Sequence, residues 1–483
     1  MTEKESTGGQ HIHSSGAVPT ASPRFSTRFA NAALLGLAVV MLALIVLGLH
    51  AQQRHRIHTF TGTALALAVP YFLAAWIVWR ARTARSTLLL TLALAGVFRV
   101  GPLLSPVYLS TDAYRYVWDG RVQAHGINPY RYVPADPHLA FLRDAAIYPH
   151  INRKEYAPTV YPPFAQAVFW LLTRFGETIT TVRLAMVGCE ALAAFFIVRL
   201  LRDFGDPAQR VLLFAWHPLC IWEFAGGAHC DAVMLAAVAL ALWAHRRDQP
   251  FATGGALALA TLVKFFPVVM FPALYRRWRG DWRMPLAFAG TVVAAYLPYV
   301  WTFNLRGALG FLPAYTQEEG LASGDRFFFL NLLPTALLRR HGWHPLPTFA
   351  ALALLTLAGA AAWALWRRPA DDRSDLRRSA GLAALFLGLL SAALGWYNTW
   401  LTIFLPLLGE ASLAWLPSAA FVLYANWLHH RPDEVFLQNA FIFLPALALW
   451  LVPAAWRRWR TERLPPACAP APAVAPAPPP DRR

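Results

Sequence analysis

The long polar segment in the body of the chain carries the residues best suited to chemistry. Positions 110–120 read STDAYRYVWDG, so Asp112, Arg115 and Asp119 share one face if the segment is helical. A carboxylate next to an apolar stretch can act as a general base, which makes Asp112 the candidate catalytic residue. Asp119 and Arg115 are candidate ligand-binding residues, and the ring of Tyr114 can stack on a ring-shaped ligand. An ordinary surface loop with a capping Asp and salt bridges is the alternative.

The composition indicates what holds this segment in place. Of 483 residues, 57% are hydrophobic and only 14% are charged, a balance far more apolar than that of soluble domains. The net charge is +17, but the basic residues lie in clusters between apolar runs, which is typical of a membrane protein and does not indicate nucleic-acid binding. The sequence therefore predicts an all-α polytopic membrane protein. A soluble enzyme, a disulfide-rich secreted domain and a disordered protein are excluded.

The apolar runs predict a bundle of about 12–14 transmembrane helices with a long first outer loop. Run 252–275 contains Lys264 and Pro267 near its centre and is expected to form two short helices that meet at one face. The expected spans are 30–50, 60–79, 86–104, 180–200, 211–224, 231–245, 252–275, 284–302, 346–366, 379–395, 397–409, 412–428 and 436–455.

The distribution of Lys and Arg sets the expected orientation. With the N-terminus inside, basic residues concentrate in the inner loops and both termini are cytoplasmic. The domain organisation is then a disordered cytoplasmic tail (1–28), a transmembrane domain (29–456), and a basic, then Pro/Ala-rich, cytoplasmic tail (457–483). Loop 105–179, which carries Asp112, and a second loop, 304–326, face the periplasm or the cell exterior.

Four segments in the same order resemble one family. Positions 110–137 with the later YPPFAQ, HPLCIWEFAGGAHCDAVML at 217–235, LATLVKFFPVVMFP at 259–272 and WYNTWLTIFLPLL at 396–408 are similar to GT-C superfamily glycosyltransferases that use polyprenyl-phosphate sugars. The similarity is greatest to the bacterial glycosyltransferase family 87 mannosyltransferases. Three positions depart from the family pattern: His217 and Cys230 stand where Asn is usual, and Gly395 where Pro is common.

The resemblance implies further site residues. His229 and Asp231 match a substrate-contacting pair of the family, although Asp231 could instead cap a helix. Tyr397 and Trp400 match expected sugar or lipid contacts, with an aromatic belt as the alternative. Further substrate-binding candidates, in the segment that holds YPPFAQ, are Tyr161 and Gln166.

The resemblance also implies a lipid phosphate leaving group, which cations near the interface would stabilise. Arg99 and Lys264 are the candidates, because an ionisable residue in an apolar span is costly unless it has a function or a partner. The alternative is that each reaches to the interface or pairs with Glu190 or Glu223. No metal site or other cofactor is predicted, and a divalent metal is not expected to be required.

The combined prediction is a multi-pass enzyme of the bacterial inner membrane with a periplasmic active site. It would move a hexose, expected to be mannose, from a polyprenyl-phosphate carrier to a glycan or glycolipid acceptor, with inversion. Two alternatives stay open: a GT-C transferase of glucose, arabinose or an aminosugar acting on lipid A or protein, and a lipid or solute transporter or flippase. The expected partners are the lipid-linked donor, the acceptor and membrane lipids.

Overall fold

The computed structural model describes residues 24–304, 327–333, 340–391, 393–425 and 432–463, with single positions between 307 and 337. Within these ranges every regular element is a helix, which confirms the all-α class. Residues 1–23 of the predicted N-terminal tail, most of the second outer loop 304–326 and most of the C-terminal tail lie outside the described residues. The first helix begins at Thr27, just inside the predicted tail.

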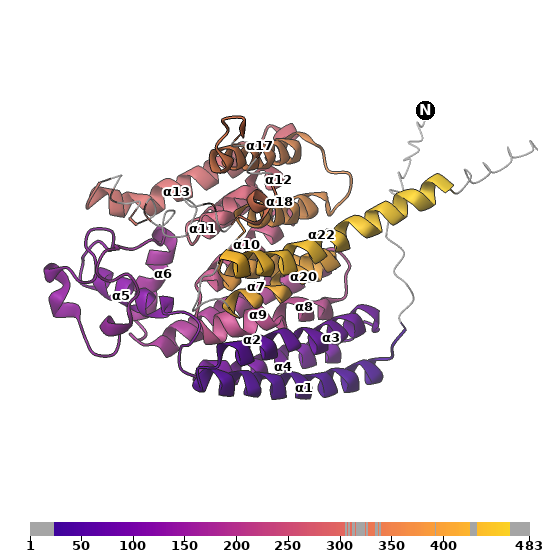
Figure 1. The fold of residues 1–483 in the computed structure, drawn as a ribbon, viewed down its shortest axis with the longest axis horizontal. Helices are drawn as coiled ribbons and strands as arrows, with labels where there is room; N and C mark the ends of the chain where they lie inside the picture. The colour runs from indigo at the N-terminus through magenta and orange to yellow at the C-terminus, as the bar shows by residue number, and fades with distance from the viewer. Residues whose placement is uncertain are drawn as a thin grey trace, which may run out of the picture.

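The first four helices pack together along one side of the molecule (Figure 1). They are α1 (Thr27–Gln53), α2 (Ile57–Ala66), α3 (Ala68–Arg80) and α4 (Arg85–Leu104). Only Leu67 separates α2 from α3, so the two follow one another as a single apolar stretch. Their buried side chains join α8, α9 and α21 in one hydrophobic cluster.

A polar lobe lies at one end of this bundle and contains α5 (Asp112–Ala124), the 3₁₀ helices η1 (Pro137–Leu142) and η2 (Tyr148–His150), and α6 (Pro163–Thr173) (Figure 1). The segment from Asp112 to Asp119 is helical, which meets the condition under which Asp112, Arg115 and Asp119 share one face. Gly120 permits the close packing of α5 on α6, because a Cβ atom there would lie 2.3 Å from the carbonyl oxygen of Phe169.

The centre of the molecule is built from α7 (Ile179–Asp203), α10 (Asp231–Arg246) and α11 (Pro250–Thr261). The expected span 211–224 is wrong as a continuous helix. It consists of α8 (Leu212–Ala215), α9 (Pro218–Cys220) and part of a π-helical turn, η4 (Ile221–Gly226), after the short 3₁₀ helix η3 (Ala208–Val211). Pro218 lacks an N–H and forces His217 into an extended conformation, which ends the preceding helix.

The break predicted in 252–275 is confirmed. Helix α11 ends at Thr261, Lys264 lies in the turn that follows, and η5 (Phe266–Met270) and α12 (Phe271–Leu274) lead back. The later elements are η6 (Arg277–Arg279), α13 (Arg283–Trp301), α15 (Phe328–Asn331), α17 (Pro345–Trp366), α18 (Ser374–Leu390), η8 (Gly395–Phe404), α19 (Leu405–Leu408), α20 (Ala411–Ala419), α21 (Val422–Ala425) and α22 (Pro432–Arg463).

The expected span 397–409 is also wrong as an α-helix. Most of it is the buried 3₁₀ helix η8, in which Thr399 and Thr402 direct their hydroxyl groups to backbone carbonyls three residues earlier. Such local side-chain hydrogen bonds compete with α-helical bonding. The tight helix brings Trp396 and Trp400 into the core beside α10.

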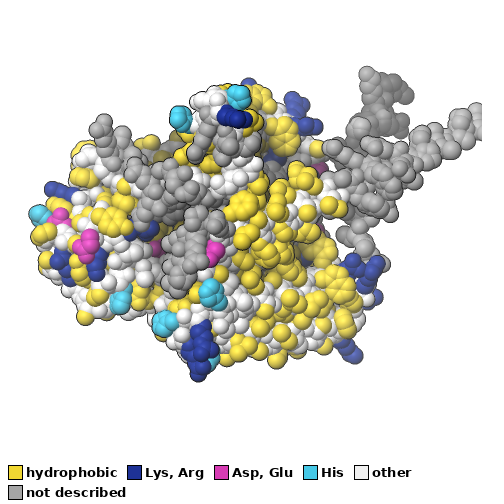
Figure 2. Space-filling model, viewed as in Figure 1, with side chains coloured by type: hydrophobic (Ala, Val, Ile, Leu, Met, Phe, Trp, Pro, Cys, Tyr) yellow, Lys and Arg dark blue, Asp and Glu magenta, His cyan; other side chains and the backbone are white. Residues whose placement is uncertain are grey.

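Seven helices in the described part are long and apolar enough to cross a membrane, which supports a polytopic membrane protein. They are Thr27–Gln53, Ile57–Arg80, Arg85–Leu104, Ile179–Asp203, Arg283–Trp301, Pro345–Trp366 and Glu434–Val452. Figure 2 shows hydrophobic side chains over the middle of the visible face, with charged and His side chains mostly on the lobe and along the margins. The other expected spans correspond to shorter helices, so the larger helix count stays a prediction.

Candidate active site

Asp112 is the first residue of α5, at the junction of the lobe and the bundle. Its position in the first helical turn places the carboxylate near the positive end of the helix dipole. Oδ1 accepts a 2.7 Å hydrogen bond from Nδ2 of Asn152, 40 positions further along the chain. The side chain is 16% exposed, so the carboxylate is oriented by the protein and still accessible. A fixed, accessible carboxylate is what a general base requires.

Two buried side chains continue from Asp112 into the bundle. Nε2 of His229 lies 4.0 Å from Oδ2 of Asp112, and Nδ1 of the same ring lies 2.9 Å from Oε2 of Glu223. The second contact is within ion-pair distance but outside hydrogen-bond geometry. The other Glu223 oxygen, Oε1, accepts a hydrogen bond from the hydroxyl group of Tyr424. Glu223 and His229 are fully buried, and the His229 ring stacks on Trp396 at 4.3 Å.

The backbone between Glu223 and His229 is unusual, and this places both side chains. Glu223 lies in the π-helical turn, whose wider ring shifts the side-chain register relative to an α-helix. The amide of His229 donates to the carbonyl oxygen of Glu223 at 3.0 Å, which closes the segment into a loop. Ala228 has φ +60°, a left-handed conformation that an alanine adopts only at a cost in energy. Strain of this kind persists where the surrounding structure requires it.

A second cluster consists of Asp231, Lys264 and Trp400. Its first member is only two positions after His229 in the chain. Oδ2 of Asp231 accepts from Nζ of Lys264 at 2.6 Å, and Oδ1 accepts from the indole N–H of Trp400 at 2.6 Å. The Lys264 ammonium also lies over the ring of Tyr397, 4.9 Å from its centre. The alternative that Asp231 caps α10 is wrong, because Cys230 occupies the N-cap position without a side-chain cap and both Asp231 oxygens bind other side chains.

Several predicted substrate-binding residues form a buried network beside Asp112. Arg115 donates to Oδ1 of Asp119 at 2.8 Å, and Nε2 of Gln166 donates to Oδ2 of Asp119 at 3.0 Å. Gln166 also donates to the hydroxyl group of Thr159 at 2.7 Å. Asp119 is 1% exposed and Gln166 0%. The network joins α5 to α6, so the structure gives Asp119, Arg115 and Gln166 a supporting position behind the site.

The aromatic candidates divide between the core and the lobe surface. The hydroxyl groups of Tyr161 and Tyr116 are 3.5 Å apart, and Tyr161 is 8% exposed. Tyr114 is only half-buried and packs its ring against His150, with the ring centres 4.8 Å apart. Tyr114 therefore lines the more open part of the lobe, while Tyr161 is part of its interior.

Arg99 pairs with Glu190, which is the alternative to a phosphate contact given for it in the sequence analysis. Its guanidinium group is buried and donates to both carboxylate oxygens of Glu190, to the carbonyl oxygen of Ala95 at 2.5 Å and to that of Ala215 at 2.9 Å. These bonds take up the donors that a phosphate would use. The predicted phosphate contact is thus not supported for Arg99, whereas Lys264 lies beside the candidate site.

Sequence reasoning missed four contributors to this region: Glu223, Tyr424, Asn152 and the packing role of Trp396. The sequence suggests Glu223 only as a partner for a cation in a neighbouring span, and the structure pairs it with His229 and Tyr424 instead. The signal available was an acidic residue inside an apolar run, six positions before the matched His229. Nothing in the sequence pointed to Asn152. No cluster of three or more metal-ligating side chains occurs among the described residues.

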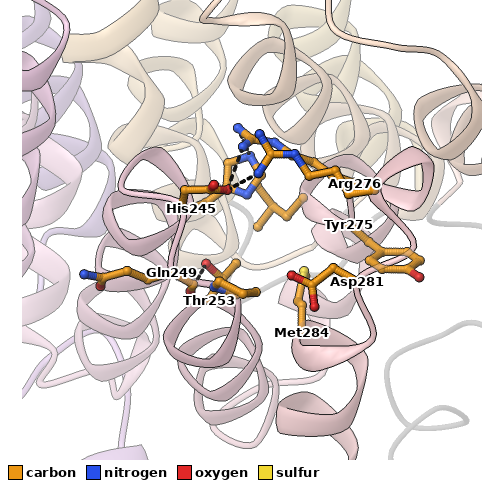
Figure 3. Close-up of a pocket in the computed structure, with 11 residues that line it drawn as sticks. His245, Gln249, Thr253, Tyr275, Arg276, Asp281 and Met284 are labelled. Carbon is orange, nitrogen blue, oxygen red and sulfur yellow. Dashed lines mark hydrogen bonds and ion pairs between the residues drawn. The ribbon is translucent and has the colours of Figure 1, made fainter.

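A separate pocket lies at the opposite ends of α10 and α11 (Figure 3). It is partly open to solvent, and His245 lies about 21 Å along α10 from Asp231 at the usual helical rise. Arg276 pairs with Asp375 at 3.4 Å, and His245 contacts the same carboxylate at 3.0 Å. The cations here already have carboxylate partners, and the pocket is remote from Asp112. We therefore assign the candidate active site to the Asp112 region.

The N-terminal half of the chain matches a known protein family. Residues 29–280, just over half of the chain, match the family model described as "Alpha-(1->6)-mannopyranosyltransferase, N-terminal domain". The matched range contains Asp112, Glu223, His229 and Lys264. The chain is also 24% identical over 367 residues to alpha-(1->6)-mannopyranosyltransferase A of Mycobacterium tuberculosis, which covers 68% of this chain and 69% of the relative. This protein belongs to the alpha-(1->6)-mannopyranosyltransferase family of GT-C-type, family 87-like membrane glycosyltransferases.

Proposed function

We propose that this protein transfers a mannosyl residue from a polyprenyl-phosphate carrier to a hydroxyl group of a glycan or glycolipid, with Asp112 as the catalytic base. The observation that carries the proposal is the half-enclosed carboxylate of Asp112 at the start of α5, held by Asn152 and facing His229 at the mouth of an apolar bundle. A lipid-linked donor suits such a position, because its hydrocarbon tail can stay in the membrane while its sugar reaches the lobe.

The acceptor hydroxyl group is activated by Asp112. The separation of 4.0 Å between Asp112 Oδ2 and His229 Nε2 is too long for a direct hydrogen bond. In this step the hydroxyl proton passes to Asp112, the acceptor oxygen bonds to the anomeric carbon, and the bond from that carbon to the phosphate oxygen breaks. The polyprenyl phosphate leaves with the bonding electrons.

Lys264 is proposed to stabilise the leaving phosphate. Its ammonium group is 15% exposed and lies between Asp231 and the ring of Tyr397, in the turn that follows α11. A cation fixed in advance of the reaction stabilises developing negative charge without having to reorganise. Tyr397 and Tyr114, which are only partly buried, are then available as apolar and stacking surfaces for the donor and acceptor sugars, and Trp400 supports the site from the core.

We further propose that the reaction inverts the anomeric centre and occurs on the periplasmic face of a bacterial inner membrane, with both chain termini in the cytoplasm. A single positioned base is enough for one direct displacement, whereas a double displacement needs a second carboxylate about 5–5.5 Å away, by analogy with glycosidases. Glycan or glycolipid acceptors and membrane lipids are the expected partners. No metal ion or other cofactor is proposed to take part.

The proposal is tested with the purified full-length protein in detergent. Short-chain polyprenyl-phosphate mannose is supplied as separate α and β anomers with an oligomannoside acceptor. We expect an α-linked product from the β anomer only, in the presence of a chelator, and a loss of at least about 1,000-fold for Asp112→Asn, in line with the removal of a base and its charge. Transfer from the corresponding glucose or arabinose donors in place of mannose, or full activity of Asp112→Asn, would overturn it.

A further inference from the structure

The segment that holds the Asp112 carboxylate is itself anchored on α5, the helix that Asp112 begins. We propose that Arg115 and Asn152 are positioning residues for Asp112: Arg115 fixes the turn 153–157, and this turn fixes Asn152 against the carboxylate. This inference rests on the proposed function, in which Asp112 takes the proton of the acceptor. It gives Arg115 a role different from the substrate contact expected from the sequence.

Asn152 makes the direct contact with the base. Its Nδ2 group donates to Oδ1 of Asp112 at 2.7 Å, and the backbone amide of Asp112 donates to the hydroxyl group of Ser110 at 3.2 Å. A side-chain amide donates to a carboxylate and carries no charge of its own. Asn152 can therefore fix the orientation of Asp112 without competing for the proton of the acceptor.

The residue after Asn152 has a strained backbone. Arg153 has φ +54°, in the left-handed region, and a residue with a Cβ atom keeps such a conformation only where its surroundings require it. Two backbone hydrogen bonds supply that requirement. The carbonyl oxygen of Arg153 accepts from the amide of Ala157 at 3.0 Å, and that of Lys154 accepts from the amide of Ala135 at 2.9 Å. A movement of Ala157 is therefore passed on to Asn152.

Arg115 anchors this turn on α5. Its Nη1 donates to the carbonyl oxygen of Ala157 at 3.1 Å, while its Nε donates to Oδ1 of Asp119 at 2.8 Å. The planar guanidinium group holds both acceptors at once in a fixed relative position. Arg115 is 4% exposed, so it is enclosed by the protein and suits an anchor better than a substrate contact. The connection starts at Asp112, passes through Asn152 and Ala157, and returns to the same helix three positions after Asp112.

The deciding experiment measures kcat and both KM values for mannosyl transfer by the full-length protein in detergent. The variants are Asn152→Ala, Arg115→Lys and the double variant. Lysine keeps the charge beside Asp119 but lacks the planar fork that also holds Ala157. Each single variant should lower kcat about tenfold or more, because the base is displaced by a fraction of an ångström. The KM values for donor and acceptor should stay within about threefold of the wild type, since neither residue touches a substrate.

The double variant tests whether the two residues act through one connection. If they do, it should lose no more than about threefold in kcat beyond the weaker of the two single variants, whereas independent effects would multiply to about 100-fold. Removal of Arg115 can leave Asp119 as a buried charge without its partner. Arg115→Met combined with Asp119→Asn removes both charges and takes the place of Arg115→Lys if that variant does not accumulate.

Asn128→Ala is the matched control. Asn128 is another asparagine of the lobe, and its amide donates to the carbonyl oxygen of Tyr299 at 3.0 Å and to the hydroxyl group of Thr302 at 2.8 Å. Its loss should lower the thermal stability and leave kcat within about threefold of the wild type. An equal fall in kcat for Asn128→Ala and Asn152→Ala would show a general weakening of the lobe and would overturn the inference.

Three further results would overturn the inference and leave the proposed function standing. They are an unchanged kcat in Asn152→Ala, multiplied losses in the double variant, and a raised KM with an unchanged kcat in the Arg115 variant, which would indicate a substrate contact. In each case Asp112→Asn still abolishes transfer. Full activity of Asp112→Asn would instead overturn the proposed function, and the inference with it.

Discussion

Lys264 and Asp231 form an ion pair, with Nζ 2.6 Å from Oδ2, that joins the turn after α11 to the first residue of α10. Asp231 is fully buried, and its other oxygen accepts from Trp400. The pair thus has two roles: it satisfies a buried carboxylate and it fixes a cation next to the site proposed for the donor phosphate. These roles can be separated by experiment, because one concerns folding and the other concerns transfer.

Asp231→Asn should destabilise the protein, since the amide keeps an acceptor for Trp400 but leaves Lys264 as a buried cation without its partner. Removal of one member of a buried pair costs about 3–5 kcal/mol. The double variant Asp231→Asn with Lys264→Met removes both charges and should recover most of the thermal stability in detergent, while its KM for the lipid-linked donor stays raised at least about tenfold. Equal stability of the single and double variants would contradict this interpretation.

A side chain at position 227 should displace the ring of His229. A Cβ atom at position 227 would lie 2.9 Å from Nδ1 of His229 and 3.1 Å from the carbonyl oxygen of Glu223. The ring cannot move aside freely, because it stacks on Trp396. Gly227→Ala should lower kcat about 100-fold, as expected when a reacting group is displaced by about 1 Å.

The neighbouring glycine provides the control for this prediction. At Gly226 the nearest atoms to an added Cβ are 3.8 Å away, which is ordinary van der Waals contact. Gly226→Ala should therefore retain kcat within about threefold, a change comparable to that of most substitutions that leave packing intact. The two variants are compared by initial rates at saturating donor, and similar losses in both would indicate a general effect of the π-helical segment.

The positions of Asp112 and Lys264 could be predicted from the sequence. Asp112 was predictable because its position after an apolar span and its spacing to Arg115 and Asp119 are local properties. The Arg115–Asp119 pair on one helical face follows from the same spacing. The break at Lys264 was predictable as well, since Pro267 and a charge within an apolar run disfavour one continuous helix.

The roles of Glu223 and Asn152 were not predictable in the same way. Glu223 reaches His229 through a π-helical turn and a left-handed alanine, conformations that residue spacing does not encode. Asn152 contacts Asp112 across 40 positions that contain α5, two 3₁₀ helices and the irregular turns between them. Helical periodicity likewise favoured regular helices over 211–224 and 397–409, where tertiary packing selected short helical pieces and a 3₁₀ helix.

The polar lobe should resist mild acid because of Arg121. This buried side chain pairs with Asp144 at 2.6 Å and with Glu177 at 2.7 Å. Partial burial raises the pKa of Asp144, but hydrogen bonds from Arg121 and from the amides of Ile147 and Tyr148 have the larger combined effect, so this pKa lies below its ordinary value.

A carboxyl group with a lowered pKa stabilises the folded state at neutral pH and loses that effect as the pH falls through its folded-state pKa. Proteolysis within 136–150 should therefore stay slow down to about pH 4 and accelerate below it. Arg121→Met should abolish this pH dependence and make the loop susceptible at neutral pH. The rate of proteolytic cleavage within 136–150, measured across this pH range, provides the readout, and identical protection in the variant would contradict the prediction.

Arg183 should be needed to hold the two catalytic segments together. From α7 it donates to the carbonyl oxygen of Gly226, through Nη2 at 2.6 Å, and to those of Leu103, at 3.2 Å, and Ser105. The first carbonyl precedes His229, and the other two lie at the end of α4, on the path to Asp112. Arg183→Lys keeps the charge but loses the planar fork that binds both segments at once. It should reduce kcat about tenfold or more, because Asp112 and His229 are slightly displaced from one another, and should change the donor KM little.

Arg199→Lys on the same helix is the control, because Arg199 lies over the rings of Phe195 and Trp243 and should retain activity. A rise in donor KM with unchanged kcat in Arg183→Lys would show that the clamp serves donor binding and not the alignment of Asp112 with His229.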